Sequence, residues 1–508
     1  MSEKENNKDV GQVSMPDNKE QDERSMLTPK EKVSETRHTV VIDDQEISYT
    51  AIAGTIILKE PDKEKGEKPK GTIFFIAYTM NDVEDIGKRP LTFSFNGGPG
   101  SSSVWLHLGL LGPRRVLLDD EGNAPPPPHQ LVNNEYSIFN KTDLVFIDPI
   151  GTGFSRAVPG EDEKQFYNFK KDIETAGEFI RRYVTRYKRW SSPKFLAGES
   201  YGAVRGAGLT GFLQDRYGMY FNGIMFLSSV LNFQTILFEH GNDLPYILFL
   251  PAYTAAAWYH KQLSAELQKD LRETVKEVKE FALTEYTVAL MKGSTISDDE
   301  RQTIIHKLAK YTGLSETYIE QTNLRIEIFR FTKELLRHER RTIGRLDSRM
   351  KGIDRDAAGQ HFEYDPAITV LQGCYTAALY DYLGRELKFD SDLIYETLNI
   401  DVFNSWRYQQ HENRFAEVSE TLRHAMTKNP YLKVFIACGY YDMGTPALAA
   451  EYGFNHLGID PSLQKNISMA HYEAGHMMYI HRPSLIEMKK DLDEFIESAT
   501  HVSHASCL

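Results

Sequence analysis

The chain has 508 residues, of which 41% are hydrophobic and 26% are charged, and its formal net charge is -13. This length allows a large core and more than one domain, and the acidic balance argues against nucleic acid or an anionic membrane as a partner. Its cysteines, Cys374, Cys438 and Cys507, form an odd and sparse set that excludes a disulfide framework, and no pair has metal-site spacing.

The first part of the chain carries no recognisable targeting signal. Residues 1–37 are highly charged, almost free of aromatic residues, and lack the apolar run of a secretory signal. We expect them to form a disordered tail. No stretch of about 18 apolar residues occurs, so no membrane span is predicted. Together these features predict a cytoplasmic protein.

Strand-like runs begin at residue 38 and later alternate with helical stretches. Strands are predicted at 39–42, 47–53, 55–58, 72–78, 91–95, 143–148, 194–197 and 222–230, with a charged loop at 61–71 and an amphipathic helix at 166–190. Successive strands that give way to alternating strands and helices are typical of an α/β domain with a partly parallel sheet. We place the first part of this core at 38–260.

A glycine-rich loop, Asn96-Gly97-Gly98-Pro99-Gly100, directly follows the strand that ends at residue 95. Glycines carry no side chain, so backbone N–H groups of this loop can approach a ligand closely. A phosphate-binding loop is disfavoured because no lysine follows. A tight structural turn is the remaining alternative.

The segment Gly198-Glu199-Ser200-Tyr201-Gly202 fits the G-x-S-x-G pattern of a nucleophile elbow. Such a serine sits on a sharp turn between a strand and a helix, where side chains two residues away on either side would collide. Glycine at both positions removes these collisions. Residues 194–197 suit the strand and residues 203–213 suit the helix. The alternative is a glycine-rich turn that happens to contain a serine.

The composition changes between residues 261 and 352, where strand signals disappear and charge density rises. Helices are predicted at 263–290, 298–311 and 315–341, and we interpret them as a helical cap inserted into the core. The second part of the core follows at 353–500, with strands at 432–439 and within 465–479 and a closing helix at 483–498. Residues 501–508 form a terminal tail.

A serine nucleophile needs a base and a carboxylate that orients the base, in the chain order Ser, Asp or Glu, His for this fold class. Asp442 follows a predicted strand, and His476 follows a later one in a turn that contains a glycine. The other histidines fit less well: His471 lies inside the strand, and His411 and His424 lie on helical stretches.

At this point the sequence resembles the serine carboxypeptidase family. The resemblance rests on residues 96–102, 148–155 and 198–202 and on the pair 439–442 with 475–476, which occur in the family's order. It implies an α/β-hydrolase fold: a mostly parallel central sheet with flanking helices and an inserted helical cap. It also implies Ser200 as nucleophile, His476 as general base and acid, Asp442 as its orienter, and the N–H groups of Gly98 and Tyr201 as the oxyanion hole.

The family recognises a substrate's free C-terminal carboxylate with an asparagine and two acids, which implies substrate contacts at Asn96, Glu199 and the adjoining Gly97. This sequence departs from the family pattern at three positions. Leu110 stands in place of the second acid, Ser94 in place of an aromatic residue, and Ser101 in place of a disulfide cysteine.

The predicted function is therefore a serine carboxypeptidase without metal or cofactor that acts on peptides with a free C-terminus. An acyltransferase or esterase with the same triad is the near alternative, and a non-catalytic scaffold is the distant one.

Overall fold

The computed structural model describes residues 30–62 and 66–500. Its centre is one large twisted sheet in the order β1-β2-β3-β7-β4-β9-β10-β13-β14, with the short β8 paired to β3. Strands β1, β2, β3 and β7 pair antiparallel with one another in that order, and β7, β4, β9, β10, β13 and β14 pair in parallel. The bounds are β1 Val33–Ile42, β2 Gln45–Asp62, β3 Gly66–Met80, β4 Leu91–Phe95, β7 Asp143–Ile147, β8 Arg156–Ala157, β9 Lys194–Ser200, β10 Gly223–Ser229, β13 Lys433–Gly439 and β14 Ile467–Tyr472.

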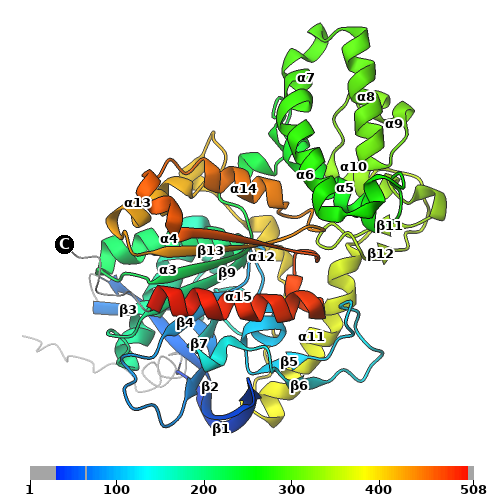
Figure 1. The fold of residues 1–508 in the computed structure, drawn as a ribbon. Helices are drawn as coiled ribbons and strands as arrows, with labels where there is room; N and C mark the ends of the chain where they lie inside the picture. Colours follow the sequence, from blue (N-terminus) through cyan, green and yellow to red (C-terminus); the bar gives the residue numbers. More distant parts are fainter. Residues whose placement is uncertain (1–29, 63–65, 501–508) are drawn as a thin grey trace, which may run out of the picture.

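Helices cover both faces of the sheet because its strands are apolar on both sides. In β9, Phe195 and Ala197 join one hydrophobic cluster while Leu196 joins the other, as expected from the two-residue period of a strand. One face packs against α3 Phe169–Arg186, α4 Tyr201–Tyr217, α13 Ser419–Lys428 and α14 Ala447–Asn455. The other packs against α2 Val104–Leu106, α11 Pro366–Arg385 and α15 Arg482–Thr500, the last visible across the front of Figure 1.

A helical lobe projects from the carboxyl end of the parallel strands (Figure 1). It contains α5 Leu244–Tyr259, α6 Leu271–Phe281, α7 Thr287–Lys292, α8 Asp298–Thr312, α9 Glu316–Gln321 and α10 Ile328–Glu334, which share a hydrophobic cluster. The Tyr253 ring of α5 stacks on Phe331 of α10 at 4.1 Å between centroids. This packing groups α5 with the helices after residue 261, so the lobe starts earlier than the boundary predicted from charge density.

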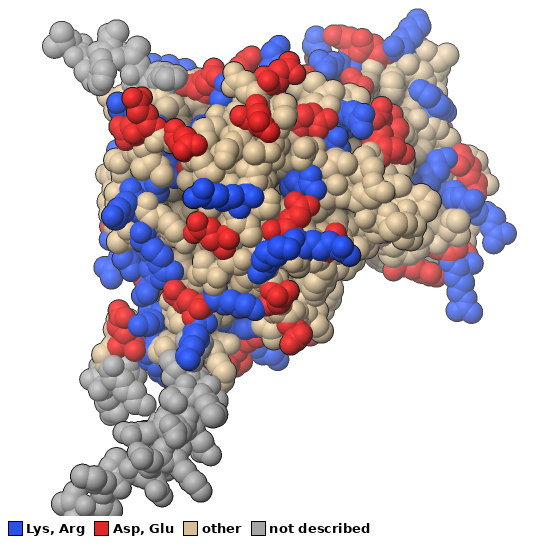
Figure 2. Space-filling view, turned by 90° about the horizontal axis from the view of Figure 1, so that it is seen from below, with Lys and Arg blue, Asp and Glu red and all other residues tan. Residues whose placement is uncertain are grey.

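Smaller elements complete the described chain. Hairpins are formed by β5 Arg114–Val116 with β6 Leu131–Asn133, and by β11 Thr342–Ile343 with β12 Lys351–Gly352 at the base of the lobe. The short helix α12 Ile400–Ser405 follows α11. No helix among residues 30–62 and 66–500 combines the length and the apolarity needed to cross a bilayer. Figure 2 shows acidic and basic side chains interspersed over the face seen from below.

Three further boundaries predicted from the sequence are wrong. The tail expected to extend to residue 37 ends before β1, which begins at Val33; its remaining part at 1–29 and the tail at 501–508 lie outside the described residues. The loop expected at 61–71 belongs largely to the β2–β3 hairpin, whose ladder extends to Asp62 and Gly66. The helix expected at 166–190 ends at Arg186, because Lys188 adopts a left-handed φ of 56°.

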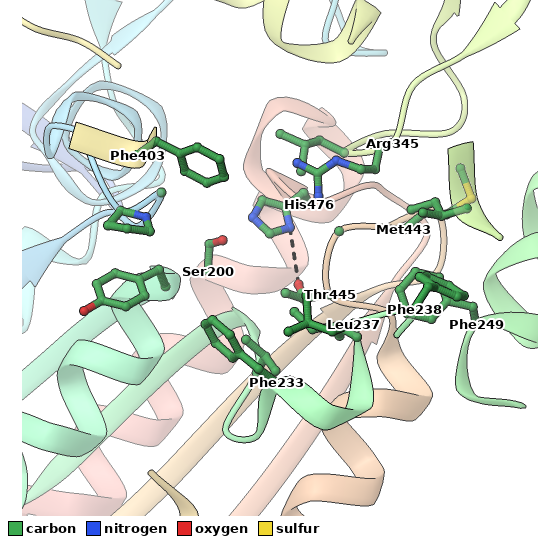
Figure 3. A pocket seen from close by; sticks show the side chains of 18 of the residues that line it. Ser200, Phe233, Leu237, Phe238, Phe249, Arg345, Phe403, Met443, Thr445 and His476 are labelled. Atoms are coloured by element: carbon green, nitrogen blue, oxygen red, sulfur yellow. Dashed lines mark hydrogen bonds between the residues drawn. The ribbon is translucent and has the colours of Figure 1, made fainter. Parts of the chain in front are cut away.

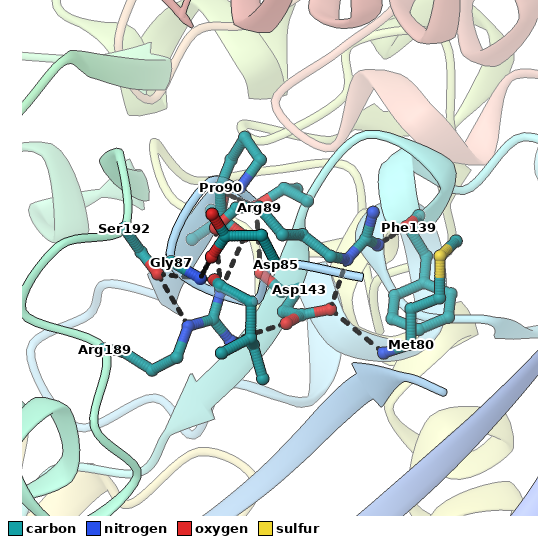
Figure 4. A network of polar contacts seen from close by, with 12 residues as sticks. Met80, Asp85, Gly87, Arg89, Pro90, Phe139, Asp143, Arg189 and Ser192 are labelled. Carbon is teal, nitrogen blue, oxygen red and sulfur yellow. Dashed lines mark hydrogen bonds and ion pairs between the residues drawn. The ribbon is translucent and has the colours of Figure 1, made fainter. Parts of the chain in front are cut away.

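A buried ion network fastens the amino end of β7 (Figure 4). The Asp143 carboxylate accepts hydrogen bonds from Arg89 Nε at 2.7 Å, from Arg189 Nη1 at 2.6 Å and from the Met80 amide at 3.0 Å. Both oxygens of the carboxylate are thereby occupied, and the side chains of Asp143, Arg189 and Arg89 are only 1%, 2% and 9% exposed. The network lies at the amino ends of the strands, opposite the edge where β9 ends at Ser200.

Replacing Asp143 with alanine should lower the free energy of unfolding by about 3–5 kcal/mol, because two buried guanidinium groups lose their counter-charge. Chemical denaturation would measure the loss. The exposed Asp392→Ala variant is the control and should change stability by about 0.5 kcal/mol or less. Equal stability of the two variants would show that the Asp143 network contributes nothing beyond a surface charge.

Candidate active site

Ser200 occupies a strained turn between β9 and α4. Its backbone has φ 60° and ψ -126°, a conformation that side-chain-bearing residues rarely adopt. The neighbouring glycines are required by space. A Cβ on Gly198 would lie 2.3 Å from the Gly202 carbonyl oxygen, and one on Gly202 would lie 2.8 Å from the Phe95 carbonyl oxygen. The turn therefore holds the serine side chain out at the carboxyl edge of the sheet.

Asp442 and His476 are brought together from the loops after β13 and β14. Asp442 Oδ2 lies 2.8 Å from His476 Nδ1. Asp442 also accepts from the amides of Gly444 at 2.7 Å and Thr445 at 3.0 Å, and from the Thr445 hydroxyl at 2.8 Å. Both residues are almost fully buried. These three donors fix the carboxylate, and the carboxylate fixes the imidazole ring.

The electrostatics of this pair favour its charged form. Burial alone would raise the pKa of Asp442, but the charge and hydrogen bond of His476 and the Thr445 donors bring it below its usual value. Burial alone would lower the pKa of His476, and the charge and hydrogen bond of Asp442 raise it instead. The carboxylate thus stabilises a proton on the imidazole, as a general base requires when it accepts one.

Ser200 and His476 line one cavity of about 610 Å³ between the sheet and the helical lobe. In Figure 3 the hydroxyl of Ser200 lies on the side of the imidazole away from the Nδ1 edge, which faces Thr445. Nε2 is therefore the ring nitrogen directed toward the serine. The three residues predicted as a triad meet at a single site.

The predicted oxyanion donors also line this cavity, on its sheet side. Tyr201 is the first residue of α4, where an amide has no acceptor within its own helix. The Gly97 backbone approaches this amide so closely that a Cβ on Gly97 would lie 2.5 Å from the Tyr201 nitrogen. Gly98 has a φ of 102° and carries the loop past the end of β9. Gly98 and Tyr201 thus both lie at the cavity beside Ser200, and their role as oxyanion donors stays a prediction.

A second buried ion pair holds this loop against α4. Asp172 of α3 accepts from Arg205 Nε at 2.9 Å and from the Tyr201 hydroxyl at 3.1 Å. The guanidinium of Arg205 also donates to the Asn96 carbonyl at 2.6 Å through Nη1. The glycine loop and the start of α4 are therefore cross-linked behind the cavity.

The predicted substrate-binding pair is assembled but enclosed. Asn96 Nδ2 donates to Glu199 Oε1 at 2.8 Å, and the Leu106 amide donates to Asn96 Oδ1 at 3.1 Å. Asn96 is 1% and Glu199 4% exposed, and neither they nor Gly97 are among the residues that line the cavity. Burial raises the pKa of Glu199 to about 7, against the opposing charge of His476. Contact of this pair with a substrate carboxylate stays a prediction.

The positions where the chain departs from the family pattern are filled by core or turn residues. Leu110 and Ser94 are fully buried, and Leu110 belongs to the hydrophobic cluster. Ser101 accepts from Trp105 Nε1 at 2.8 Å. His107 lies 2.6 Å from the Tyr78 hydroxyl, and burial lowers its pKa to about 3. Trp105 and His107 are therefore packing residues.

Glu199→Gln should flatten the dependence of stability on pH. The folded-state pKa of about 7 lies above the ordinary value of 4.5, so the folded protein holds this proton where the unfolded chain releases it. The stabilisation is complete below about pH 4.5 and is lost as the pH rises through 7, a change of about 3 kcal/mol. Thermal unfolding from pH 4.5 to 8 should show a smaller decline for Glu199→Gln than for the wild type.

The exposed Glu473→Gln variant supplies the matched change of carboxylate to amide and should keep the wild-type profile. The charge of Glu199 also raises the pKa of His476, so losing that charge in Glu199→Gln reduces the His476 contribution to the decline in the same direction. Parallel curves for the wild type and Glu199→Gln would contradict the assignment of the proton to Glu199.

Most of the cavity wall was not predicted from the sequence. It is formed by apolar side chains of the segment after β10, of the lobe and of α12, together with Arg345 and Thr445: Val230, Phe233, Ile236, Leu237, Phe238, Phe249, Ile328, Phe329, Leu346, Phe403, Trp406, Tyr408 and Met443. The cluster of aromatic residues at 233–249 was the available signal. Its position over Ser200 depends on the path of the lobe, which no local pattern gives.

A mostly parallel sheet carrying a strained serine at the end of β9, with an Asp–His pair from later strands, defines an α/β-hydrolase of the serine type. The crystal structure of Kex1(delta)p, a prohormone-processing carboxypeptidase from Saccharomyces cerevisiae, is similar with a TM-score of 0.55 and 17% identity, covering 88% of this chain and 91% of that one. This likeness shows the fold.

The family model for serine carboxypeptidases matches residues 64–482, so the chain belongs to the serine carboxypeptidase family. Similar sequences include the pheromone-processing carboxypeptidase KEX1 of S. cerevisiae, 35% identical over 29% of this chain and 20% of the relative. Serine carboxypeptidase-like 36 of Arabidopsis thaliana is 32% identical over 26% of each chain. The carboxypeptidase Y homolog of Arthroderma benhamiae is 31% identical over 30% of this chain and 28% of the relative. The matched segments thus span less than a third of these relatives.

Proposed function

We propose that this protein is a serine-type carboxypeptidase that hydrolyses the C-terminal peptide bond of peptides through an acyl-enzyme on Ser200. The observation that carries the proposal is the convergence of the strained Ser200 and the His476–Asp442 pair, joined at 2.8 Å, on one cavity. Membership of the serine carboxypeptidase family supports a peptide as the substrate.

The first half of the reaction forms the acyl-enzyme. Ser200 Oγ attacks the scissile carbonyl carbon while His476 Nε2 takes the hydroxyl proton. The negative charge that develops on the carbonyl oxygen is stabilised by the amides of Gly98 and Tyr201. The positive end of the α4 dipole lies at the same place and adds to this effect. Collapse of the intermediate breaks the C–N bond, and His476 passes its proton to the leaving amine.

The second half repeats these steps with water as the nucleophile. His476 takes a proton from water, the resulting hydroxide attacks the acyl carbon, and the proton returns to Ser200 Oγ as the acid leaves. Asp442 stays ionised and holds the imidazole in the tautomer with Nδ1–H, as its lowered pKa requires.

An esterase or acyltransferase with the same triad is the second candidate. It is favoured by the enclosure of Asn96 and Glu199 and by the burial of Leu110, which leave no acidic carboxylate sensor on the cavity wall at these positions. In that case an alcohol, in place of an amine, leaves or accepts the acyl group.

Labelling with a fluorophosphonate and product analysis separate the candidates. The wild type should be labelled and Ser200→Ala should not, and release of single C-terminal amino acids from a peptide mixture supports the carboxypeptidase. Labelling together with ester turnover but without amino-acid release favours the esterase or acyltransferase. Absence of labelling in folded wild-type protein would leave only a scaffold role.

A further inference from the structure

Arg345 places a positive charge in the cavity beside the catalytic histidine. It lies in the hairpin loop at 344–350, between β11 and β12, and lines the same cavity as Ser200 and His476. Figure 3 shows its guanidinium next to the His476 imidazole. A Cβ on Gly444 would lie 3.2 Å from Arg345 Nη1, which locates the guanidinium over the loop that carries Asp442.

The backbone of this loop is fixed to both catalytic loops. The Met443 amide donates to the Arg345 carbonyl at 3.0 Å, and the His476 amide donates to the Leu346 carbonyl at 2.6 Å. The loop is also closed on itself by a bond from the Gly344 amide to the Met350 carbonyl at 2.9 Å. Arg345 is therefore presented from a rigid support, as a binding group requires.

The guanidinium has unused hydrogen-bonding capacity. Within residues 30–62 and 66–500 no carboxylate lies within ion-pair distance of it, and none of its N–H groups has a hydrogen-bond acceptor. Burial raises the pKa of Asp365 although the charge of Arg345 opposes this, and Asp365 accepts hydrogen bonds from the amides of Leu346 at 3.2 Å and Ala367 at 3.1 Å.

The acid on the cavity wall is committed elsewhere. Glu327 caps α10 by accepting from the amides of Phe329 at 2.9 Å and Arg330 at 3.2 Å, and burial raises its pKa. The rest of the wall is mostly apolar, with aromatic side chains from Phe233, Phe249, Phe329 and Trp406. A fixed cation with free donors in such a wall strongly attracts an anion, because little water competes for it.

We propose that Arg345 is the carboxylate-binding residue of this cavity, and that the substrate places an apolar group in the cavity and a carboxylate on the guanidinium. An arginine fork binds a carboxylate through two parallel hydrogen bonds, which match its planar geometry. The carboxylate is either the free C-terminus of a peptide or the side chain of an acidic residue. The choice of a peptide rests on the proposed function; the carboxylate site itself does not.

The arrangement also couples binding to chemistry. The charge of Arg345 opposes protonation of His476, and a bound carboxylate offsets this repulsion when the imidazole accepts the serine proton. A substrate that carries the carboxylate therefore gains in the transition state as well as on binding.

The binding test uses the folded but inactive Ser200→Ala variant with 4-phenylbutyrate and 4-phenylbutyramide, which differ only in the charged group. Calorimetry should show that the acid binds more tightly than the amide. Adding Arg345→Gln should weaken binding of the acid by about 10- to 100-fold and should change binding of the amide by no more than about twofold. Arg345→Lys should keep part of the preference. Arg341→Gln, four residues away and not on the cavity wall, should keep all of it.

Equal binding of acid and amide by the parent, or an undiminished preference in a folded Arg345→Gln protein, would overturn the proposal. This arm requires no turnover, so a protein that binds the acid through Arg345 but releases no amino acid contradicts the proposed function alone.

The kinetic arm identifies which carboxylate binds. N-blocked dipeptides are compared as free acid and amide, and as Glu and Gln at the residue before the scissile bond. If Arg345→Gln loses the preference for the free acid over the amide, the group bound by Arg345 is the C-terminal carboxylate. If it loses the preference for Glu over Gln, the group is the side-chain carboxylate. Retention of both preferences in the variant would contradict the proposal.

Discussion

Replacing Ser200 or His476 with alanine is expected to lower kcat by about 10⁴- to 10⁶-fold. The serine supplies the bond-forming oxygen and the histidine moves its proton, so neither step has a substitute in the cavity. Folding should be little affected. Asp442 keeps three donors, from Gly444 and Thr445, when the imidazole is removed. Turnover of a chromogenic ester and of a peptide, measured at protein concentrations determined by absorbance, gives both kcat values.

His471→Ala is the matched control for the histidine variant. His471 lies five residues earlier in β14 and pairs with Glu451 at 3.0 Å, away from Ser200. This variant should keep near wild-type kcat. The double variant Ser200→Ala, His476→Ala should be no slower than either single one, because the residues act as a unit. Near wild-type turnover in either single variant would remove that residue from the mechanism.

Asp442→Asn is expected to lower kcat by about 10⁴-fold through the tautomer of His476. The amides of Gly444 and Thr445 both donate to Oδ1, so the carbonyl of an asparagine would occupy that position. Its NH₂ group would then face His476 Nδ1 and donate to it. The imidazole would carry its proton on Nε2, where it cannot accept one from Ser200.

The pH profile distinguishes this tautomer effect from simple loss of charge. The asparagine variant should regain activity at alkaline pH, where hydroxide assists proton removal, while its Tm stays close to that of the wild type. Thr445→Val removes one donor to Asp442 Oδ2 without reversing the tautomer and should cost about tenfold or less. A loss of similar size in both variants would contradict the tautomer argument.

The features that depend on short-range geometry could be predicted from the sequence. The elbow at Ser200 needs glycine at 198 and 202 for reasons of local space, and those glycines are visible without a fold. Asp442 follows a strand that its apolar run marks clearly, and His476 follows a strand that the sequence places only within residues 465–479. The order of these residues along the chain was enough to place them at one edge of a parallel sheet.

The features that depend on tertiary packing could not be predicted in the same way. The charged residues at 61–71 resemble a loop, but residues 61–62 and 66–71 belong to a long hairpin in which β2 pairs with β3. The helix α5 is apolar on most sides and carries no charge pattern, so only its packing on α10 assigns it to the lobe. Arg345 lies about 130 residues before His476 in the chain, and nothing near it in the sequence indicates that the two meet.

Engineered chimeras in which the helical lobe is exchanged must keep the hairpin loop at 344–350. The carbonyls of Arg345 and Leu346 are the acceptors for the amides of Met443 and His476, so a junction placed after residue 352 would remove the support of both acid and base. Junctions near residues 244 and 341 leave this support in place. Lobes can then be varied for substrate choice while the catalytic geometry is inherited unchanged from the core.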